Sequence, residues 1–278
     1  GFGEALSAAR SANLVILAMG EDFNMSGEAA CRTDIRLPGV QQELLKELKK
    51  TGKRCALILF NGRPLDLSWE DANMDAILEA WFPGTLAGHG IADIVFGDYN
   101  PSAKLTISFP RNIGQLPIYY NHKNTGRPVD PANPKADYRS SYLDVDNSPL
   151  YPFGYGLSYS TFEISNLKID KKVIKRGDSI TVTVDVVNTG NYDGEEVVQL
   201  YIKDIVASVT RPVKELKGFS KILLKKGEKK VVKFVITEKE LAFYDANMNY
   251  TAETGDFMLW ISTSSADEKN VISFKLDN

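Results

Sequence analysis

Apolar runs and amphipathic stretches alternate along the first 110 residues. Leu14–Gly20 (LVILAMG) and Arg54–Phe60 (RCALILF) are continuous apolar runs of strand length. Such runs predict strands that are buried on both faces of a parallel sheet. Residues 75–82 (DAILEAWF) predict a third strand, and residues 104–109 (KLTISF) predict a last one.

Helical patterns lie between these predicted strands. Residues 2–13 have helical character, residues 39–51 place Leu44, Leu45 and Leu48 on one stripe, and Ala87–Phe96 reads as a further helix. Strands that alternate with helices predict an α/β sandwich domain with a parallel, flavodoxin-like sheet. Because the pattern opens on a helix and supplies only about four strands, we expect this domain to lack its N-terminal part. The alternative is a small complete domain.

The second half of the chain has a different pattern. Residues 111–160 are rich in Pro, Tyr, Asn and Gly, and they predict an extended segment without regular elements. Short alternating strands without helices between them indicate an antiparallel β-sandwich of the immunoglobulin or fibronectin type III kind. These strands are predicted at residues 179–188, 197–203, 229–237, 256–262 and 271–276. The predicted parts are therefore an α/β domain at 1–118, a connecting segment at 119–160 and a β-sandwich at 161–278.

Composition narrows the classes of function. The 278 residues are 43% hydrophobic and 25% charged, with a formal net charge of -3. This charge argues against broad nucleic-acid binding, which needs a basic surface. No apolar run reaches the roughly 18–20 residues of a membrane span. Two cysteines are too few for a disulfide framework or a structural zinc site, and with only two histidines a histidine-based metal site is poorly supplied.

The loop after the first apolar run holds the densest group of charged side chains. Ligands of open α/β sheets bind beyond the carboxyl ends of the strands, and residues 19–36 (MGEDFNMSGEAACRTDIR) follow such an end. Its carboxylates are candidates for general acid/base catalysis. The alternative is a solvated surface loop whose charges pair with one another. The charged residues are Glu21, Asp22, Glu28, Arg32, Asp34 and Arg36.

A second loop, NGRP, follows the second apolar run and contains Arg63. This arginine could bind a polar ligand or hold a neighbouring carboxylate, and it could equally be a turn residue. The PGT sequence at 83–85 lacks the glycine spacing of a phosphate loop. A flavodoxin-like domain that binds a nucleotide or flavin is therefore the weakest of the possible functions.

Several motifs occur together and in a fixed order. They include SGEA within residues 20–32, NGRP at 61–64, AWFPGTLAGHGIADIVFGDYNPSAKLTISFP at 80–110, PLYPFGYGLSYSTF at 149–162 and RPVKELKGF at 211–219. The ordered set resembles the C-terminal portion of family 3 glycoside hydrolases of the periplasmic β-glucosidase type. The resemblance covers nearly the whole chain.

The resemblance implies a three-part enzyme. An N-terminal (β/α)8 barrel, absent from this sequence, would carry the nucleophilic aspartate. The α/β sandwich domain would supply the acid/base glutamate from a loop, and a fibronectin type III-like domain would close the chain. On this basis Glu28, in SGEA, is assigned as the acid/base. Glu21 is the alternative, and its place at the strand end suits it better to anchor the loop through Arg32 or Arg63. These three residues are accordingly candidates for loop anchoring or substrate binding.

The implied reaction is the hydrolysis of terminal non-reducing β-D-glucosyl residues with retention, and the chain alone is expected to be inactive. The implied partners are a β-glucoside or oligosaccharide and the missing barrel, with no nucleic acid, membrane or cofactor. A homodimer could form through the face that the barrel would cover, and a periplasmic or secreted location is expected. The alternatives are a fragment of a related β-xylosidase and a carbohydrate-binding or scaffolding module without catalysis.

Overall fold

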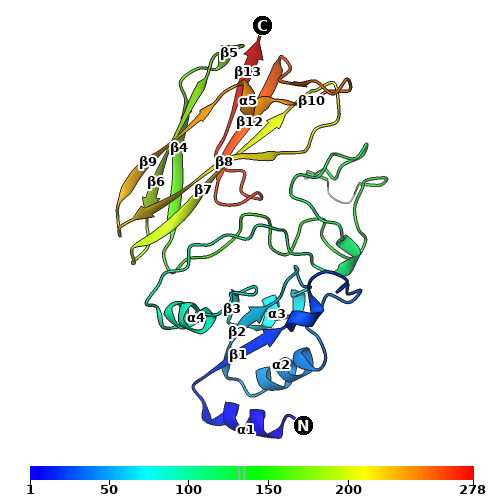
Figure 1. Cartoon of the computed structure of the whole chain (residues 1–278), viewed down its shortest axis with the longest axis vertical. Coiled ribbons are helices and arrows are strands. Elements are labelled where there is room, and N and C mark those ends of the chain that lie inside the picture. Colours follow the sequence, from blue (N-terminus) through cyan, green and yellow to red (C-terminus); the bar gives the residue numbers. More distant parts are fainter. Residues whose placement is uncertain (131, 134–135) are drawn as a thin grey trace. The chain divides into compact units, whose positions relative to one another are not determined.

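The computed structural model describes residues 1–130, 132–133 and 136–278. The chain divides into two compact units, each with its own sheets (Figure 1). Unit 1 contains residues 1–96, 108–118 and 148–151, and unit 2 contains residues 97–107, 119–147 and 152–278.

A parallel sheet of three strands, in the order β1-β2-β3, forms the centre of unit 1. Its strands are β1 (Leu14–Gly20), β2 (Arg54–Phe60) and β3 (Ala76–Glu79). The apolar runs therefore predicted β1 and β2 with their bounds, and β3 lies inside the predicted third strand. Leu57 and Leu59 of β2 are fully buried, as expected for the central strand of a covered sheet.

The prediction that β1 is buried on both faces is wrong. Leu14 and Ile16 are 48% and 43% exposed, whereas Leu17 is buried. The reason is that Leu14 and Ile16 lie on one face of β1, which is not covered, while Leu17 lies on the opposite, packed face. The strand is also at the edge of the sheet and pairs only with β2. At its carboxyl end the open edge is closed by a side chain: the Gln41 amide accepts a hydrogen bond from Gly20 N at 2.8 Å and donates one to Gly20 O at 2.9 Å.

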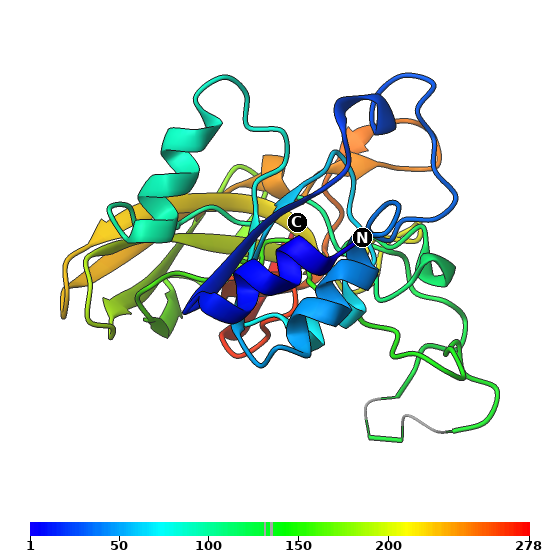
Figure 2. The same ribbon diagram turned by 90° about the horizontal axis from the view of Figure 1, so that it is seen from below.

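Four α-helices accompany this sheet in the described part of the chain, and α1 and α2 lie next to each other (Figure 2). The helix α2 buries Leu45 and Leu48 from the predicted stripe, and Gly52 follows it with a positive φ of 73°. The prediction missed the short helix α3. The helices are α1 (Gly3–Ser11), α2 (Gln41–Lys49), α3 (Ser68–Asn73) and α4 (Ala87–Phe96), with 3₁₀ turns η1 (Phe23–Met25) and η2 (Ile113–Gln115).

The predicted last strand at residues 104–109 is wrong. This segment joins no sheet, and its backbone bonds instead to residues 150–155. Leu105 N donates to Tyr155 O at 2.8 Å, and Phe109 N donates to Tyr151 O at 2.9 Å. The alternating pattern of KLTISF marks an extended backbone, but its partner is an irregular aromatic segment and not another strand.

Unit 2 is the predicted all-β region. A five-stranded sheet has the order β5-β13-β12-β7-β8, a three-stranded sheet has the order β4-β6-β9, and β10 and β11 form a small antiparallel pair. All five predicted strands exist, and β4, β5, β8, β10 and β11 were not predicted. The strands are β4 (Phe162–Ile169), β5 (Val173–Lys175), β6 (Ile180–Asn188), β7 (Gly194–Asp204), β8 (Glu215–Leu224), β9 (Lys229–Ile236), β10 (Phe243–Tyr244), β11 (Tyr250–Thr251), β12 (Gly255–Ser262) and β13 (Val271–Asp277), and a short helix α5 (Glu238–Leu241) follows β9.

The two larger sheets of unit 2 share one apolar core. Alternate residues of β6 are buried, because one face of the strand packs on the core and the other does not. Val182 and Val186 of β6 and Leu200 of β7 are fully buried in the same cluster as Leu259 of β12. This confirms the prediction of a fibronectin-like β-sandwich.

Candidate active site

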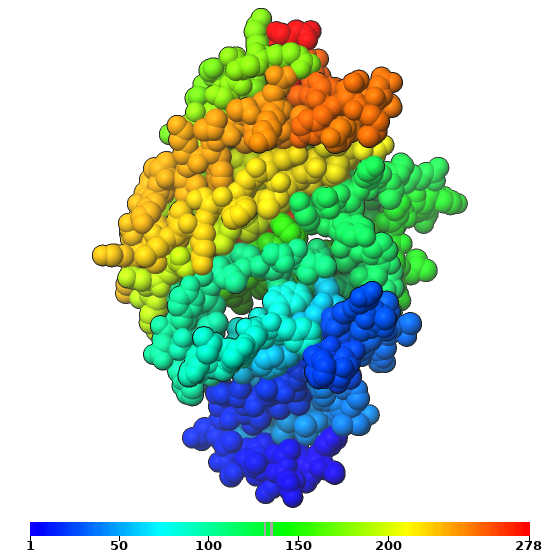
Figure 3. Space-filling view, in the orientation of Figure 1, coloured from blue at the N-terminus to red at the C-terminus, as the bar shows by residue number. Residues whose placement is uncertain are grey.

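The charged loop lies between β1 and α2 and leaves the sheet at the carboxyl end of β1. It extends beyond the strand in Figure 2, and its blue atoms are at the surface of unit 1 in Figure 3. The loop opens with the turn η1, where the Asp22 carboxylate accepts a hydrogen bond from Asn24 N at 2.7 Å. This bond satisfies one of the free amides of the turn.

Glu21 is the buried anchor of the loop, with a side chain that is 0% exposed. Its Oε1 atom lies 2.7 Å from Arg32 Nη1 and 3.0 Å from Arg63 Nε. The Gly62 amide donates to its Oε2 atom at 3.3 Å. Two guanidinium groups and one backbone donor therefore compensate the loss of water around this carboxylate.

Arg63 also binds the loop itself. Its Nη2 atom donates hydrogen bonds to the carbonyls of Met25 and Ala30, the latter at 2.8 Å. Its neighbour Gly62 allows the loop to approach closely, because a Cβ atom there would lie 2.0 Å from Ser26 Oγ. The NGRP turn after β2 thus holds the loop that follows β1.

Glu28 lies in sequence between the two residues whose carbonyls Arg63 binds. It is exposed, and among the described residues it takes part in none of the ion pairs around Glu21. The backbone on either side turns through positive φ values, 135° at Gly27 and 58° at Ala29. The structure therefore brings Glu21, Arg32 and Arg63 together and leaves the Glu28 carboxylate open to solvent.

Asp34 and Arg36 form a separate pair on the outer part of the loop. Arg36 Nη2 lies 2.6 Å from Asp34 Oδ2, and both side chains are exposed. The side-chain hydrogen bond from Arg36 holds the pKa of Asp34 below its ordinary range. This pair behaves as the solvated, mutually paired charges that were the alternative interpretation of the loop.

Sequence reasoning missed Glu79, the last residue of β3. Its Oε1 atom accepts a hydrogen bond from Trp81 N at 2.9 Å. Burial raises the pKa of this carboxyl from its ordinary 4.5 to about 7, against smaller lowering effects of the Trp81 amide and the Asn61 side chain. A glutamate inside the apolar run DAILEAWF was the available signal, because charged residues are seldom buried without a reason.

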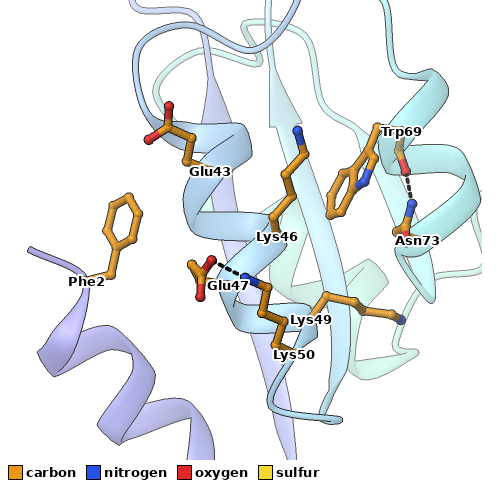
Figure 4. Close-up of a pocket in the computed structure, with 8 residues that line it drawn as sticks. All are labelled: Phe2, Glu43, Lys46, Glu47, Lys49, Lys50, Trp69 and Asn73. Atoms are coloured by element: carbon orange, nitrogen blue, oxygen red, sulfur yellow. Dashed lines mark hydrogen bonds and ion pairs between the residues drawn. The ribbon is translucent and has the colours of Figure 1, made fainter.

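A hollow with a volume of about 660 Å³ lies on unit 1 over α2 and α3 (Figure 4). Lys46 lies over the Trp69 ring at 5.7 Å and donates to Gln42 Oε1. The other two lysines of the hollow pair with Asp75 and with Glu47. No residue of the charged loop lines this hollow.

Neither a metal cluster nor a membrane-spanning helix is found among the described residues. No group of three or more His, Cys, Asp or Glu side chains is arranged to hold a metal ion. None of the helices in the described part of the chain has the length and apolar character needed to cross a membrane.

Comparison with known families identifies two domains in the chain. Residues 1–159 match the glycosyl hydrolase family 3 C-terminal domain, and residues 196–265 match the fibronectin type III-like domain. The chain therefore belongs to glycosyl hydrolase family 3 and corresponds to the C-terminal portion of its members.

The similar proteins are β-glucosidases and β-xylosidases. A periplasmic β-glucosidase of Salmonella typhimurium is 51% identical over 266 residues, which are 96% of this chain and 35% of that protein. A β-xylosidase of Formosa agariphila is 43% identical over 98% of this chain and 37% of its own length. The crystal structure of a β-glucosidase from Listeria innocua in complex with glucose superposes with a TM-score of 0.95 at 42% identity, covering 99% of this chain and 38% of that one. The chain thus spans little more than a third of the length of these relatives.

Proposed function

We propose that this chain supplies the general acid/base of a retaining, exo-acting β-glucosidase, and that Glu28 is this residue. Retaining glycosidases use two carboxyl groups about 5–5.5 Å apart. One attacks the anomeric carbon, and the other protonates the leaving oxygen and later takes a proton from water. The attacking aspartate would come from a (β/α)8 barrel that this sequence does not contain.

The observation that carries this proposal is the different placement of the two loop glutamates. Glu21 is closed off from solvent and bound by two arginines, so no glycosidic oxygen can approach it. Glu28 is exposed on the segment that Arg63 holds at Met25 and Ala30. A proton donor must reach the substrate, and Glu28 meets this requirement. We assign loop anchoring to Glu21, Arg32 and Arg63.

The names of the relatives support a glucoside as the substrate. The Salmonella β-glucosidase and the Formosa β-xylosidase are both more than 40% identical to this chain. A β-xyloside is therefore the second candidate. The ratio of kcat/KM for aryl β-glucoside and aryl β-xyloside, measured on the protein joined to its barrel, decides between them.

The name of the Salmonella relative also supports a periplasmic location for the full-length protein. We keep the division of the chain at residues 118 and 160 as part of the proposal, because it separates the α/β domain from the fibronectin-like domain. A homodimer through the barrel-facing surface stays a prediction, and sedimentation of the purified chain tests it.

Glu28→Gln in the protein joined to its barrel tests the role of Glu28. Cellobiose has a poor leaving group, so its hydrolysis should fall by about 10²–10⁴-fold, the usual contribution of an acid/base group. An activated aryl glucoside needs no protonation and should still glycosylate the enzyme. Added azide, which attacks without a general base, should then release a β-glucosyl azide. Glu43→Gln, at an exposed glutamate of α2, is the matched control.

Two results would overturn the proposal. One is normal hydrolysis of cellobiose by the Glu28→Gln protein. The other is hydrolysis of a β-glucoside by the 278-residue chain alone. If the joined protein is inactive and the chain binds insoluble glucan, a binding or scaffolding module is the better description.

A further inference from the structure

The segments that follow the three strands of unit 1 meet at the carboxyl edge of the sheet. Gly62 marks the meeting point, because a Cβ atom on this residue would lie 2.0 Å from Ser26 Oγ and 3.0 Å from Phe82 Cε2. Ser26 belongs to the charged loop after β1, Gly62 to the NGRP turn after β2, and Phe82 to the segment after β3. The Phe82 ring is therefore a neighbour of the loop that carries Glu28.

The turn after β3 separates two aromatic side chains. Trp81 has a positive φ of 52°, a backbone conformation that is uncommon for a bulky residue. Its amide donates to Glu79 Oε1 at 2.9 Å, and its ring centroid lies 5.8 Å from that of Phe109, which is 1% exposed. Phe82, the next residue, is 45% exposed. The turn thus packs one ring on the core of unit 1 and leaves the other accessible at the strand ends.

The backbone around Phe82 has little conformational freedom. Pro83 fixes its own φ and restricts the residue before it to extended conformations. Strain such as that at Trp81 persists only where the surrounding structure enforces it, and it is concentrated at ligand-binding sites. An aromatic ring that is held in this way loses little conformational entropy when a ligand packs on it.

The proposed reaction places a leaving group beside Glu28. A general acid must come within hydrogen-bonding reach of the glycosidic oxygen, so the group that leaves with this oxygen lies next to the acid. Glu28 is two residues from Ser26, a span of at most about 7 Å, and Ser26 is the residue that adjoins the Phe82 ring. We propose that Phe82 forms an apolar wall for the leaving group, on which an aryl or pyranose ring packs while Glu28 protonates the glycosidic oxygen. This inference rests on the proposed function.

Phe82 would determine specificity and take no part in proton transfer. A phenyl ring exchanges no proton, and what it offers to a ligand is apolar area and a flat face. Its contacts therefore favour ligands with a planar or pyranose ring after the glycosidic oxygen over ligands with a small alkyl group. Because these contacts are made before and during bond cleavage, their loss should raise KM more than it lowers kcat.

Calorimetry with the protein joined to its barrel tests this wall without a measurement of activity. Phenyl thio-β-D-glucoside carries a planar leaving group on a sulfur bond that resists hydrolysis, and methyl thio-β-D-glucoside is the matched probe with a small group. In Phe82→Ala the Kd of the phenyl probe should rise about tenfold, the usual effect of an apolar contact, and that of the methyl probe by less than about twofold. Phe82→Tyr keeps the ring and should retain the ratio of the two Kd values.

Phe96→Ala is the matched control, because Phe96 is another exposed phenylalanine of unit 1 and ends α4 instead of following a strand. It should leave the ratio of the two Kd values unchanged. Equal weakening of both probes in Phe82→Ala would indicate a structural role and overturn the proposal, and unchanged binding of both would overturn it as well. Phe82→Leu keeps apolar volume without the flat ring, so it provides the same test if Phe82→Ala folds poorly.

The kinetics of cellobiose hydrolysis separate this inference from the role of Glu28. Phe82→Ala should raise KM for cellobiose by about tenfold with a smaller effect on kcat, whereas Glu28→Gln acts on kcat. If Glu28→Gln hydrolyses cellobiose normally and Phe82→Ala still weakens the phenyl probe selectively, the wall is correct and the acid/base lies elsewhere. If Glu28→Gln behaves as proposed and Phe82→Ala binds the phenyl probe normally, only the wall is wrong.

Discussion

Glu79→Gln should change how the stability of unit 1 depends on pH. Glu79 titrates at an ordinary pKa of 4.5 in the unfolded chain and at about 7 in the folded one. Below a pH of about 4.5 the carboxyl is neutral in both states, so it does not change the free energy of unfolding. Between these pH values only the unfolded chain ionises, so the free energy of unfolding falls as the pH rises. Above a pH of about 7 the carboxyl is ionised in both states, and the free energy of unfolding falls no further.

The size of this loss follows from the difference between the two pKa values. A pKa raised from 4.5 to about 7 corresponds to about 3 kcal/mol. The glutamine variant has no proton to lose at this position. The difference in unfolding free energy between the Glu79→Gln chain and the unaltered chain should therefore grow by about 3 kcal/mol from pH 4.5 to pH 7.5. Other titrating groups, including Glu70, contribute equally to both proteins and cancel.

The two cysteines supply the assay. Cys55 lies in β2 and is 0% exposed, so a thiol reagent reaches it only when unit 1 opens. Cys31 is exposed on the loop and serves as the accessible reference thiol within the same protein. Pulsed alkylation in increasing urea, read by mass spectrometry at each cysteine, gives the unfolding free energy of unit 1 without a signal from unit 2. Parallel pH curves for the two proteins would refute the reasoning.

Two further substitutions test how the loop is held, and one tests the core. Glu21→Gln leaves two arginines without their carboxylate, so the unfolding free energy of unit 1, measured by Cys55 alkylation, should fall by about 3–5 kcal/mol. Glu28→Gln, at an exposed position, should change this free energy by less than about 0.5 kcal/mol. Gly62→Ala brings a Cβ atom to 2.0 Å from Ser26 Oγ, so loop hydrogen exchange should increase and adding Ser26→Gly should partly restore protection. Leu45→Ala, at a fully buried position of α2, should destabilise unit 1 by about 2–5 kcal/mol in urea unfolding.

Local sequence predicted the elements whose burial pattern is set along the chain itself. The run RCALILF gave β2 with its bounds, and AGHGIADIVF gave α4 with its bounds. The local pattern failed for residues 104–109, because alternation indicates an extended backbone but does not indicate which segment pairs with it. It also failed to show that β1 is an edge strand, because the exposure of Leu14 and Ile16 depends on what covers the sheet.

The candidate site was only partly predictable for the same reason. Charge density and strand-end position pointed to the loop, and Arg63 was identified as a group that could hold a carboxylate. The sequence left Glu21 and Glu28 open as alternatives, because burial of the Glu21 carboxylate depends on an arginine more than 40 residues away. Glu79 was missed because the burial that raises its pKa depends on the packing around the end of β3, which no local pattern encodes.

The pairing of the Gln41 amide with Gly20 has a consequence for how this family can vary. It joins the last residue of β1 to the first residue of α2, so both ends of the intervening segment are fastened to the scaffold. Lengthening a closed segment costs little, about 0.6 kcal/mol for each doubling. Insertions and deletions between these two fixed points can therefore change the reach of an acidic side chain without disturbing the sheet, which makes the segment suitable for exchange between homologues.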